Sequence, residues 1–133
     1  MPPITLTRTG DRPLTFEGEQ IATASSGNHD AIRWHELALY RTATRYVLAI
    51  AYRTRWEGEL GRDDVTVEPD DACVANRLRA YDAAAHVLGY PPGEAYREKQ
   101  LRMLRQMYAR YEDAATRLLA TLPVERLEPQ VAP

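Results

Sequence analysis

The feature that most constrains the fold is a pair of strand-like runs separated by a very short connection. Residues from Arg33 to Arg41 and from Tyr46 to Trp56 are rich in aromatic, β-branched and other strand-compatible side chains, and the four residues 42–45 separate them. A connection of this length joins antiparallel strands in a hairpin. The pattern therefore predicts a central β-hairpin, whose register is set by its turn.

The predicted register gives this hairpin two different faces. If Arg41 pairs with Tyr46, side chains alternate between the faces and the largest aliphatic residues gather on one of them. That core face consists of three cross-strand pairs: Leu39 with Leu48, Leu37 with Ile50, and His35 with Tyr52. The other face is less bulky and more mixed; it carries Trp34, Glu36, Ala38 and Tyr40 opposite Arg53, Ala51, Ala49 and Val47.

A second hairpin is predicted at the start of the chain. A turn at Gly10 sets Leu6 opposite Leu14 and Ile4 opposite Phe16. These four apolar side chains then share one face, as a half-buried pair of strands requires.

The second half of the chain predicts one more short strand, over 65–67, and then two helices. The first helix begins near Pro69, with carboxylates in its first turn, and its helical spacing of apolar residues continues to Leu88 before Gly89. The second helix covers 94–122. Its apolar stripe repeats in alternating steps of three and four, at Leu101, Leu104, Tyr108, Tyr111, Ala115, Leu118 and Leu122.

Together these elements predict one α+β domain over residues 1–123. An antiparallel β-meander of about four to five strands precedes two antiparallel helices that pack on the sheet. A length of 133 residues, with 44% hydrophobic and 27% charged side chains, fits one packed domain. Residues 124–133, which contain two prolines, are expected to form a loosely ordered tail.

The composition limits the cellular compartments and the classes of binding partner that suit this chain. The net charge of -2 provides no broad positive field for nucleic acid or an acidic membrane. The single cysteine, Cys73, excludes an internal disulfide and a cysteine-based zinc motif. Because the sequence contains no secretory leader pattern and no apolar run of membrane-spanning length, we expect a cytoplasmic protein that does not enter a membrane.

The motifs of common enzymes are absent from the sequence. The scattered glycines form neither a phosphate-binding loop nor a nucleophile elbow. A metal-assisted hydrolase is a further alternative. Its candidate ligands are His29 with Asp30, His35 with Glu36, Asp63 with Asp64, and His86. Adjacent residues on a strand such as His35 and Glu36 point to opposite faces, and acidic pairs are common in solvated loops. The sequence therefore predicts no catalytic residue, no metal ligand and no cofactor, and favours a protein that is not an enzyme.

Two kinds of binding remain. The preferred hypothesis is an interaction or accessory protein that binds a protein partner, or itself, through the second helix and the hairpin surface, with contacts at Met103, Met107 and Leu119. The alternative is a small nucleic-acid-binding protein, since a sheet face can combine aromatic stacking with arginines that reach phosphates. Its candidate residues are Trp34, Tyr40, Arg41, Arg45, Arg53 and Arg55.

A resemblance to a known family rests on short strand-like motifs in the first half of the chain. The run Leu14-Thr15-Phe16-Glu17-Gly18-Glu19, followed by Leu39-Tyr40-Arg41-Thr42 and Tyr46-Val47-Leu48, resembles the β-rich half of the bacterial EXLDI family. The family's Glu-x-Leu-Asp-Ile motif is absent and the hairpin turn lacks a glycine. The resemblance implies a bacterial source and a similar sheet, and it assigns no catalytic residue.

Overall fold

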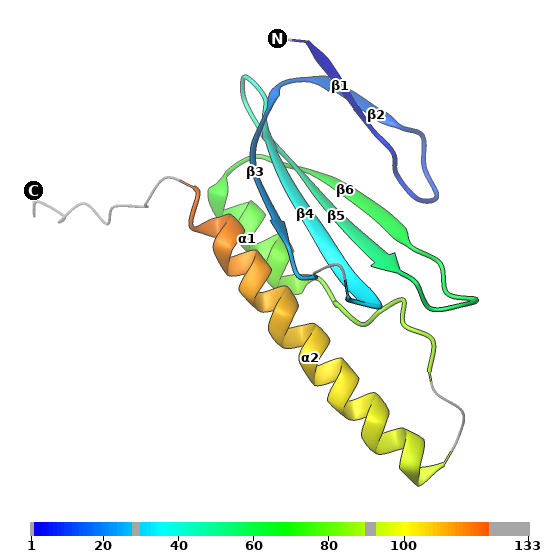
Figure 1. The fold of residues 1–133 in the computed structure, drawn as a ribbon. Coiled ribbons are helices and arrows are strands. Elements are labelled where there is room, and N and C mark those ends of the chain that lie inside the picture. Colours follow the sequence, from blue (N-terminus) through cyan, green and yellow to red (C-terminus); the bar gives the residue numbers. More distant parts are fainter. Residues whose placement is uncertain (1, 28–29, 90–92, 123–133) are drawn as a thin grey trace, which may run out of the picture.

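The computed structural model describes residues 2–27, 30–89 and 93–122, which form six strands and two helices (Figure 1). The elements, in chain order, are β1 (Pro3–Leu6), β2 (Leu14–Glu17), β3 (Glu19–Ser25), β4 (Arg33–Arg41), β5 (Tyr46–Thr54), β6 (Arg62–Glu68), α1 (Asp71–Ala80) and α2 (Glu94–Leu119). Strands β3 to β6 form an antiparallel meander in chain order, and β1 pairs with β2 in a separate sheet. The predicted α+β fold, with antiparallel helices on a meander, is confirmed.

The central hairpin has the register that its short turn predicts. Arg41 pairs with Tyr46, and the three core-face pairs also form as expected. Thr42 holds the turn, since its N–H donates to the carbonyl oxygen of Arg45 at 2.9 Å and its Oγ1 accepts the N–H of Arg45 at the same distance. The turn therefore supplies its own hydrogen bonds without a glycine.

The core lies between the meander and the two helices, which cover the same face of the sheet (Figure 1). Leu37, Leu39, Leu48 and Ile50 are all almost fully buried on this face. Burial of large aliphatic side chains is the main favourable contribution to folding. The helices cover these residues with Val74 and Leu78 from α1 and with Tyr111, Ala114 and Leu118 from α2.

The first hairpin also has its predicted pairs, but it does not extend the meander. Ile4 pairs with Phe16 and Leu6 pairs with Leu14 in the two-stranded sheet. Gly18 joins β2 to β3 at a point where a Cβ atom would lie 2.6 Å from the carbonyl oxygen of Arg41. Only a residue without a side chain allows the backbones to approach this closely. The chain changes from one sheet to the other at this glycine, so β1 and β2 form a sheet of their own, and the four strands of the meander agree with the predicted four to five.

Strand β6 is longer than the predicted 65–67. It begins at Arg62 because pairing with β5 continues through two residues that were expected to lie in a loop, Asp63 and Asp64. Each of these carboxylates accepts from a guanidinium, Asp63 from Arg53 at 2.8 Å and Asp64 from Arg62 at 2.9 Å. Aspartate is uncommon in strands, but at this half-exposed edge of the sheet the ion pairs with arginines compensate for its low strand propensity.

Helix α1 is shorter than its apolar periodicity predicts. Asp70 caps it by accepting the N–H of Cys73, close to the predicted start at Pro69, but the helix ends at Ala80 instead of continuing to Leu88. Tyr81 adopts an extended conformation, and its ring packs against His35 and Tyr111. These tertiary contacts outweigh the continuation of the helix. Helix α2 ends at Leu119, three residues before the predicted end.

Candidate functional site

Helix α2 carries two neighbouring apolar stripes, and only one of them faces the core. Met107, Tyr111, Ala114 and Leu118 recur at helical spacing and are buried against the sheet and α1. The second stripe begins at Leu101 and continues through Leu104 and Tyr108. Leu101 and Tyr108 are both 44% exposed, and Leu104 is partly buried. The described part of the chain therefore leaves this second stripe largely uncovered.

The first half of α2 extends past the end of the sheet. In Figure 1 the yellow-green start of the helix projects away from the strands, while its orange end lies against the meander. Residues 93–99 are all exposed. A helix surface that projects from a domain needs no apolar residues for the domain's own core, so Leu101 in this segment has no role in covering the sheet.

The uncovered stripe leads into a groove between the two helices. The groove has a volume of about 760 Å³, and its lining includes Leu78 and Tyr81 from the α1 side and Tyr108, Tyr111, Ala115 and Leu119 from α2. Two tyrosine hydroxyls set its width: Tyr111 donates to the carbonyl oxygen of Leu78 at 2.7 Å, and Tyr108 donates to Asp82 at 3.0 Å. The stripe and the groove form one continuous apolar track along α2, which we call the α2 track: Leu101, Leu104, Tyr108, Ala115 and Leu119.

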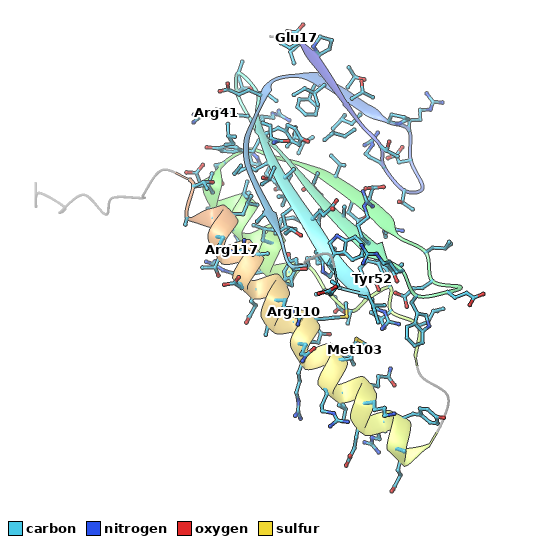
Figure 2. All side chains as sticks on the ribbon, in the orientation of Figure 1. Glu17, Arg41, Tyr52, Met103, Arg110 and Arg117 are labelled. Carbon is cyan, nitrogen blue, oxygen red and sulfur yellow. The ribbon has the colours of Figure 1, made fainter. Side chains whose placement is uncertain are left out.

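The residues predicted to contact a partner are divided between the core and the surface. Met107 is only 7% exposed and lies in the core stripe. Met103 is partly buried and lines a hollow of about 240 Å³ with Ile32 and Trp56, where α2 passes the start of β4 (Figure 2). Leu119 lies on the α2 track. A partner therefore has access to Leu119 and to part of Met103, and not to Met107.

Helical spacing could not distinguish the two stripes of α2. Leu101, Leu104 and Tyr108 were expected to be buried because they follow the heptad rule, whereas Met103 and Met107 were expected beside that stripe. The structure rotates the helix so that Met107 faces the core and Leu101 does not. The amphipathic pattern contained the correct surface, but it did not indicate which of two adjacent stripes the sheet would cover.

The aromatic and basic residues of the nucleic-acid hypothesis do not form one exposed platform. Tyr40 is 9% exposed beneath Phe16 of the first hairpin, with ring centroids 5.4 Å apart. Arg53 contacts two carboxylates, Asp63 at 2.8 Å and Glu36 at 3.6 Å.

The other four candidates for nucleic-acid binding lie at separate points of the central hairpin. Arg55 lies over the ring of Trp34 at 4.9 Å, Arg41 lies over the ring of Tyr46 at 5.6 Å, and Arg45 is exposed at the turn. Stacking and phosphate contacts require aromatic and basic groups that are available together. The structure provides such a combination at Trp34 and Arg55, far fewer residues than the hypothesis named.

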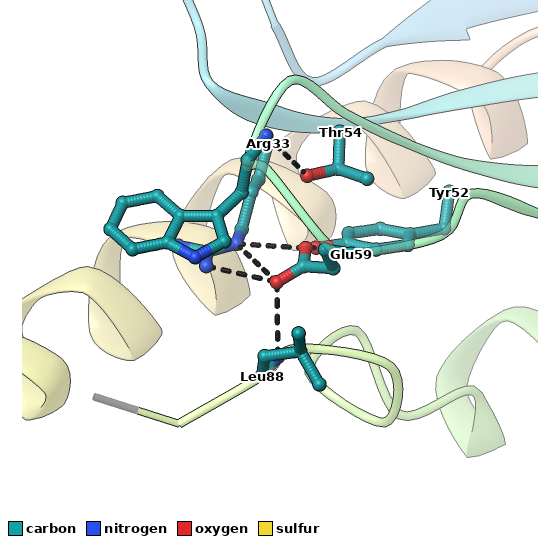
Figure 3. A network of polar contacts seen from close by, with 6 residues as sticks. Arg33, Tyr52, Thr54, Glu59 and Leu88 are labelled. Carbon is teal, nitrogen blue, oxygen red and sulfur yellow. Dashed lines mark hydrogen bonds and ion pairs between the residues drawn. The ribbon is translucent and has the colours of Figure 1, made fainter. Parts of the chain in front are cut away.

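A buried polar network lies where β4, β5 and the loop after β5 meet (Figure 3). Arg33 donates to both carboxylate oxygens of Glu59, with Nε–Oε1 and Nη2–Oε2 distances of 2.9 Å. The Tyr52 hydroxyl also donates to Glu59, as does the backbone N–H of Leu88 at 3.0 Å. The indole of Trp56 stacks on the guanidinium of Arg33 at 4.6 Å.

This network is an ion pair that the fold isolates from water. Burial alone favours the protonated carboxyl of Glu59, but hydrogen bonds from Arg33, Tyr52 and Leu88 outweigh it and lower the pKa of Glu59 to about 2. Burial, followed by the nearby Glu59 carboxylate, raises the pKa of Tyr52 above its usual range. The network joins the loop to the segment after α1. Its members are far apart in sequence and follow no periodic pattern, so sequence reasoning did not identify them.

His35 lies in an aromatic cage beneath the helices. Its ring centroid is 5.3 Å from those of Tyr52 and Tyr111 and 5.5 Å from that of Tyr81. The side chain is 1% exposed, and Nε2 has no hydrogen-bond partner in the described part of the chain. Burial, and secondarily the charge of His86, lowers the pKa of His35 to about 4. An enclosed, neutral imidazole of this kind is a core residue and not an accessible acid or base.

An open cleft separates the first hairpin from the outer face of the meander. The tip of the hairpin is tied to β6, because Thr9 N–H donates to the carbonyl oxygen of Asp63 at 2.9 Å and Asp63 N–H donates to Thr9 Oγ1 at 2.8 Å. The far end of the hairpin, near Glu17, lies away from both helices (Figure 2). The cleft of about 750 Å³ has a floor of small residues, Ala38, Ala49, Ala51 and Val65.

Within residues 2–27, 30–89 and 93–122, no group of three or more His, Cys, Asp and Glu side chains is placed to hold a metal ion. His29, one of the weighed metal ligands, lies outside the described residues, as does the tail over 124–133. Neither helix in the described ranges combines the length and apolar character needed to cross a bilayer.

Comparison of the chain with protein-family models, with curated proteins and with solved structures finds no match. The resemblance to the EXLDI family and the bacterial source that it implies therefore stay predictions.

Proposed function

We propose that this chain is an interaction protein without an active site of its own, and that it binds a helical protein partner along the α2 track. The observation that carries the proposal is the uncovered apolar stripe at Leu101, Leu104 and Tyr108. Isolated apolar residues on a surface are common and need no explanation. A row of them at heptad spacing on a projecting helix is the pattern by which helices recognise one another.

The chemistry of the surroundings supports a protein partner over a nucleic acid or a small substrate. The α2 track is flanked by residues of both charge signs, with Glu98 and Glu112 among Arg97 and Arg105. Nucleic acid requires a predominantly basic surface. His35, whose imidazole is a potential acid or base, is 1% exposed and enclosed by tyrosine rings, which leaves the helix surface as the site with the strongest geometric support.

A synthetic amphipathic helix provides a direct probe of this surface. We would measure the fluorescence anisotropy of a labelled peptide, roughly three heptads long, with leucine at the a and d positions and glutamate and lysine elsewhere. The wild-type chain is expected to bind the peptide saturably. The double variant Leu101→Glu with Leu104→Glu is expected to lose binding, because charged side chains in the track are incompatible with a dry helix pair.

The matched control is Ala109→Glu, which adds the same kind of charge to an exposed position on another side of α2. This variant should bind the peptide like wild type. Circular dichroism and urea unfolding of all three proteins check that each is folded. The proposed function is wrong if the wild-type chain does not bind the peptide, or if the control and the double variant lose binding equally.

A further inference from the structure

We infer that the partner on the first half of α2 is a second copy of this chain, bound as an antiparallel helix pair. This inference rests on the proposed function, because it names the occupant of the same surface. Leu101 and Leu104 are three residues apart and occupy successive core positions, a and d, of one heptad. In an antiparallel pair, these two positions face each other across the interface.

A twofold axis between the helices therefore places Leu101 of one copy opposite Leu104 of the other, twice. The next residues on the same stripe are Arg97 on one side and Tyr108 on the other. The same symmetry sets Arg97 of each copy against Tyr108 of its partner. A guanidinium over an aromatic ring is a favourable contact at a partly exposed interface. One antiparallel arrangement therefore pairs the leucines at the centre of the interface and pairs Arg97 with Tyr108 at each end.

The charges that flank the leucines are complementary under this symmetry. Glu98 and Arg105 are seven residues apart, so they lie on the same face of the helix, beside the two leucines. Along the chain, Glu98 precedes Leu101 and Arg105 follows Leu104. Reversing the direction of the second helix places its Arg105 beside Glu98 and its Glu98 beside Arg105. In a parallel pair, Glu98 would lie at the level of the partner's Glu98 and Arg105 at the level of the partner's Arg105, so the opposite charges would not meet. Both side chains are exposed, and within the described residues neither forms an ion pair.

The position of the helix in the fold leaves room for the second copy. Its flank with Glu98 and Arg105 points away from the buried stripe, whereas Met107 and Tyr111 point into the core. Exposed Ile32 and Trp56 lie beside Met103, at the end of the sheet from which α2 projects. In the antiparallel pair the two domains lie at opposite ends of the helix pair, and the side of α2 that carries Met103 faces away from Leu101 and from the partner helix.

The first test is the mass and its dependence on charge. Multi-angle light scattering over a wide concentration range should show a dimer, with twice the 15.1 kDa mass of one chain. Glu98→Arg alone and Arg105→Glu alone should each weaken the dimer by roughly tenfold, since symmetry replaces two attractive contacts by two repulsive ones. The double exchange of both residues should restore the affinity. Lys99→Glu is the control, because it changes the net charge as much as Arg105→Glu does, at an exposed position on another side of α2.

The second test is the orientation of the helices. In a Cys73→Ser background, a Leu101→Cys chain mixed with a Leu104→Cys chain should form a disulfide between different chains in mild oxidant. Crosslinking of Leu101→Cys chains mainly with each other would indicate a parallel pair and overturn the inference.

The outcomes separate this inference from the function on which it rests. A chain that binds the synthetic helix through Leu101 and Leu104, but stays monomeric at every concentration, refutes the second copy and leaves the proposed function intact. A chain that is monomeric and does not bind the synthetic helix refutes both. A dimer that withstands both Glu98→Arg and Leu101→Glu uses another surface, and that result also overturns the inference.

Discussion

The hydroxyl of Tyr111 on α2 donates a hydrogen bond of 2.7 Å to the carbonyl oxygen of Leu78 on α1. Both residues are buried, and the ring of Tyr111 also stacks on Tyr81 with centroids 5.3 Å apart. Tyr111 therefore joins α1, α2 and the segment that follows α1. It lies beside the uncovered part of α2, so the same tyrosine that completes the core also fixes the position of the proposed binding surface.

Replacing Tyr111 by phenylalanine should destabilise the protein by about 1 to 2 kcal/mol, because the carbonyl of Leu78 would lose its buried partner. Urea unfolding followed by circular dichroism measures the change. Tyr108→Phe is the matched control, since its hydroxyl bonds to the exposed Asp82 at the surface. Equal effects of the two substitutions would contradict the role assigned to Tyr111.

Replacing Leu39 by alanine should lower the free energy of unfolding by ~2–5 kcal/mol, because this fully buried side chain lies at the centre of the sheet's core face. Leu101→Ala removes the same atoms from an exposed helix position and should change the free energy of unfolding of the monomer by less than about 0.5 kcal/mol. A urea midpoint that scarcely moves for Leu39→Ala would mean that the core does not have this register.

Arg33→Met should destabilise the protein by roughly 3–5 kcal/mol, because it leaves the Glu59 carboxylate buried without its cation. Arg62→Met breaks the half-exposed pair with Asp64 and should cost less than about 1 kcal/mol. Thermal and urea unfolding of both variants at neutral pH compare the two pairs directly. Similar costs would show that the network around Glu59 is not isolated from water.

The stability of the protein should fall as the pH is lowered from about 6.5 to about 4, because of His35. Its folded-state pKa of about 4 lies below the unfolded value of 6.5, so the unfolded chain binds the proton first. Neutral His35 therefore contributes roughly 3 kcal/mol to the free energy of unfolding above pH 6.5, and this contribution is lost as the pH falls to about 4. His35→Phe should flatten the dependence of unfolding free energy on pH in this interval. An unchanged slope would show that other groups cause it.

A labelled single-stranded oligonucleotide should not bind the chain at physiological salt, since the charge is -2 overall and Tyr40 and Arg53 are already engaged. Fluorescence anisotropy over a range of salt concentrations measures this. Binding that weakens steeply with salt, and that is reduced by substituting Trp34 or Arg55, would support the nucleic-acid alternative instead.

Local sequence patterns predicted much of the fold because the relevant forces act over short distances along the chain. The four-residue connection after Arg41 leaves one register that brings Leu37, Leu39, Leu48 and Ile50 to the same face, and the structure has that register. The long periodic run of α2 likewise predicted a helix with the correct first residue. In both cases, alternation or helical spacing and the burial of apolar side chains favour the same structure.

Tertiary structure alone decided the features in which distant residues compete for the same space. Helix α1 ends at Ala80 because Tyr81 gains contacts with His35 and Tyr111, and no pattern within the helix indicates those partners. The pairing of Arg33 with Glu59 depends in the same way on how the loop after β5 closes over β4. The heptad spacing of α2 determined that apolar stripes exist. The rotation of the helix on the sheet decided that Met107 is covered and Leu101 is not, because the sheet and α1 bury only one side of a helix that projects beyond them.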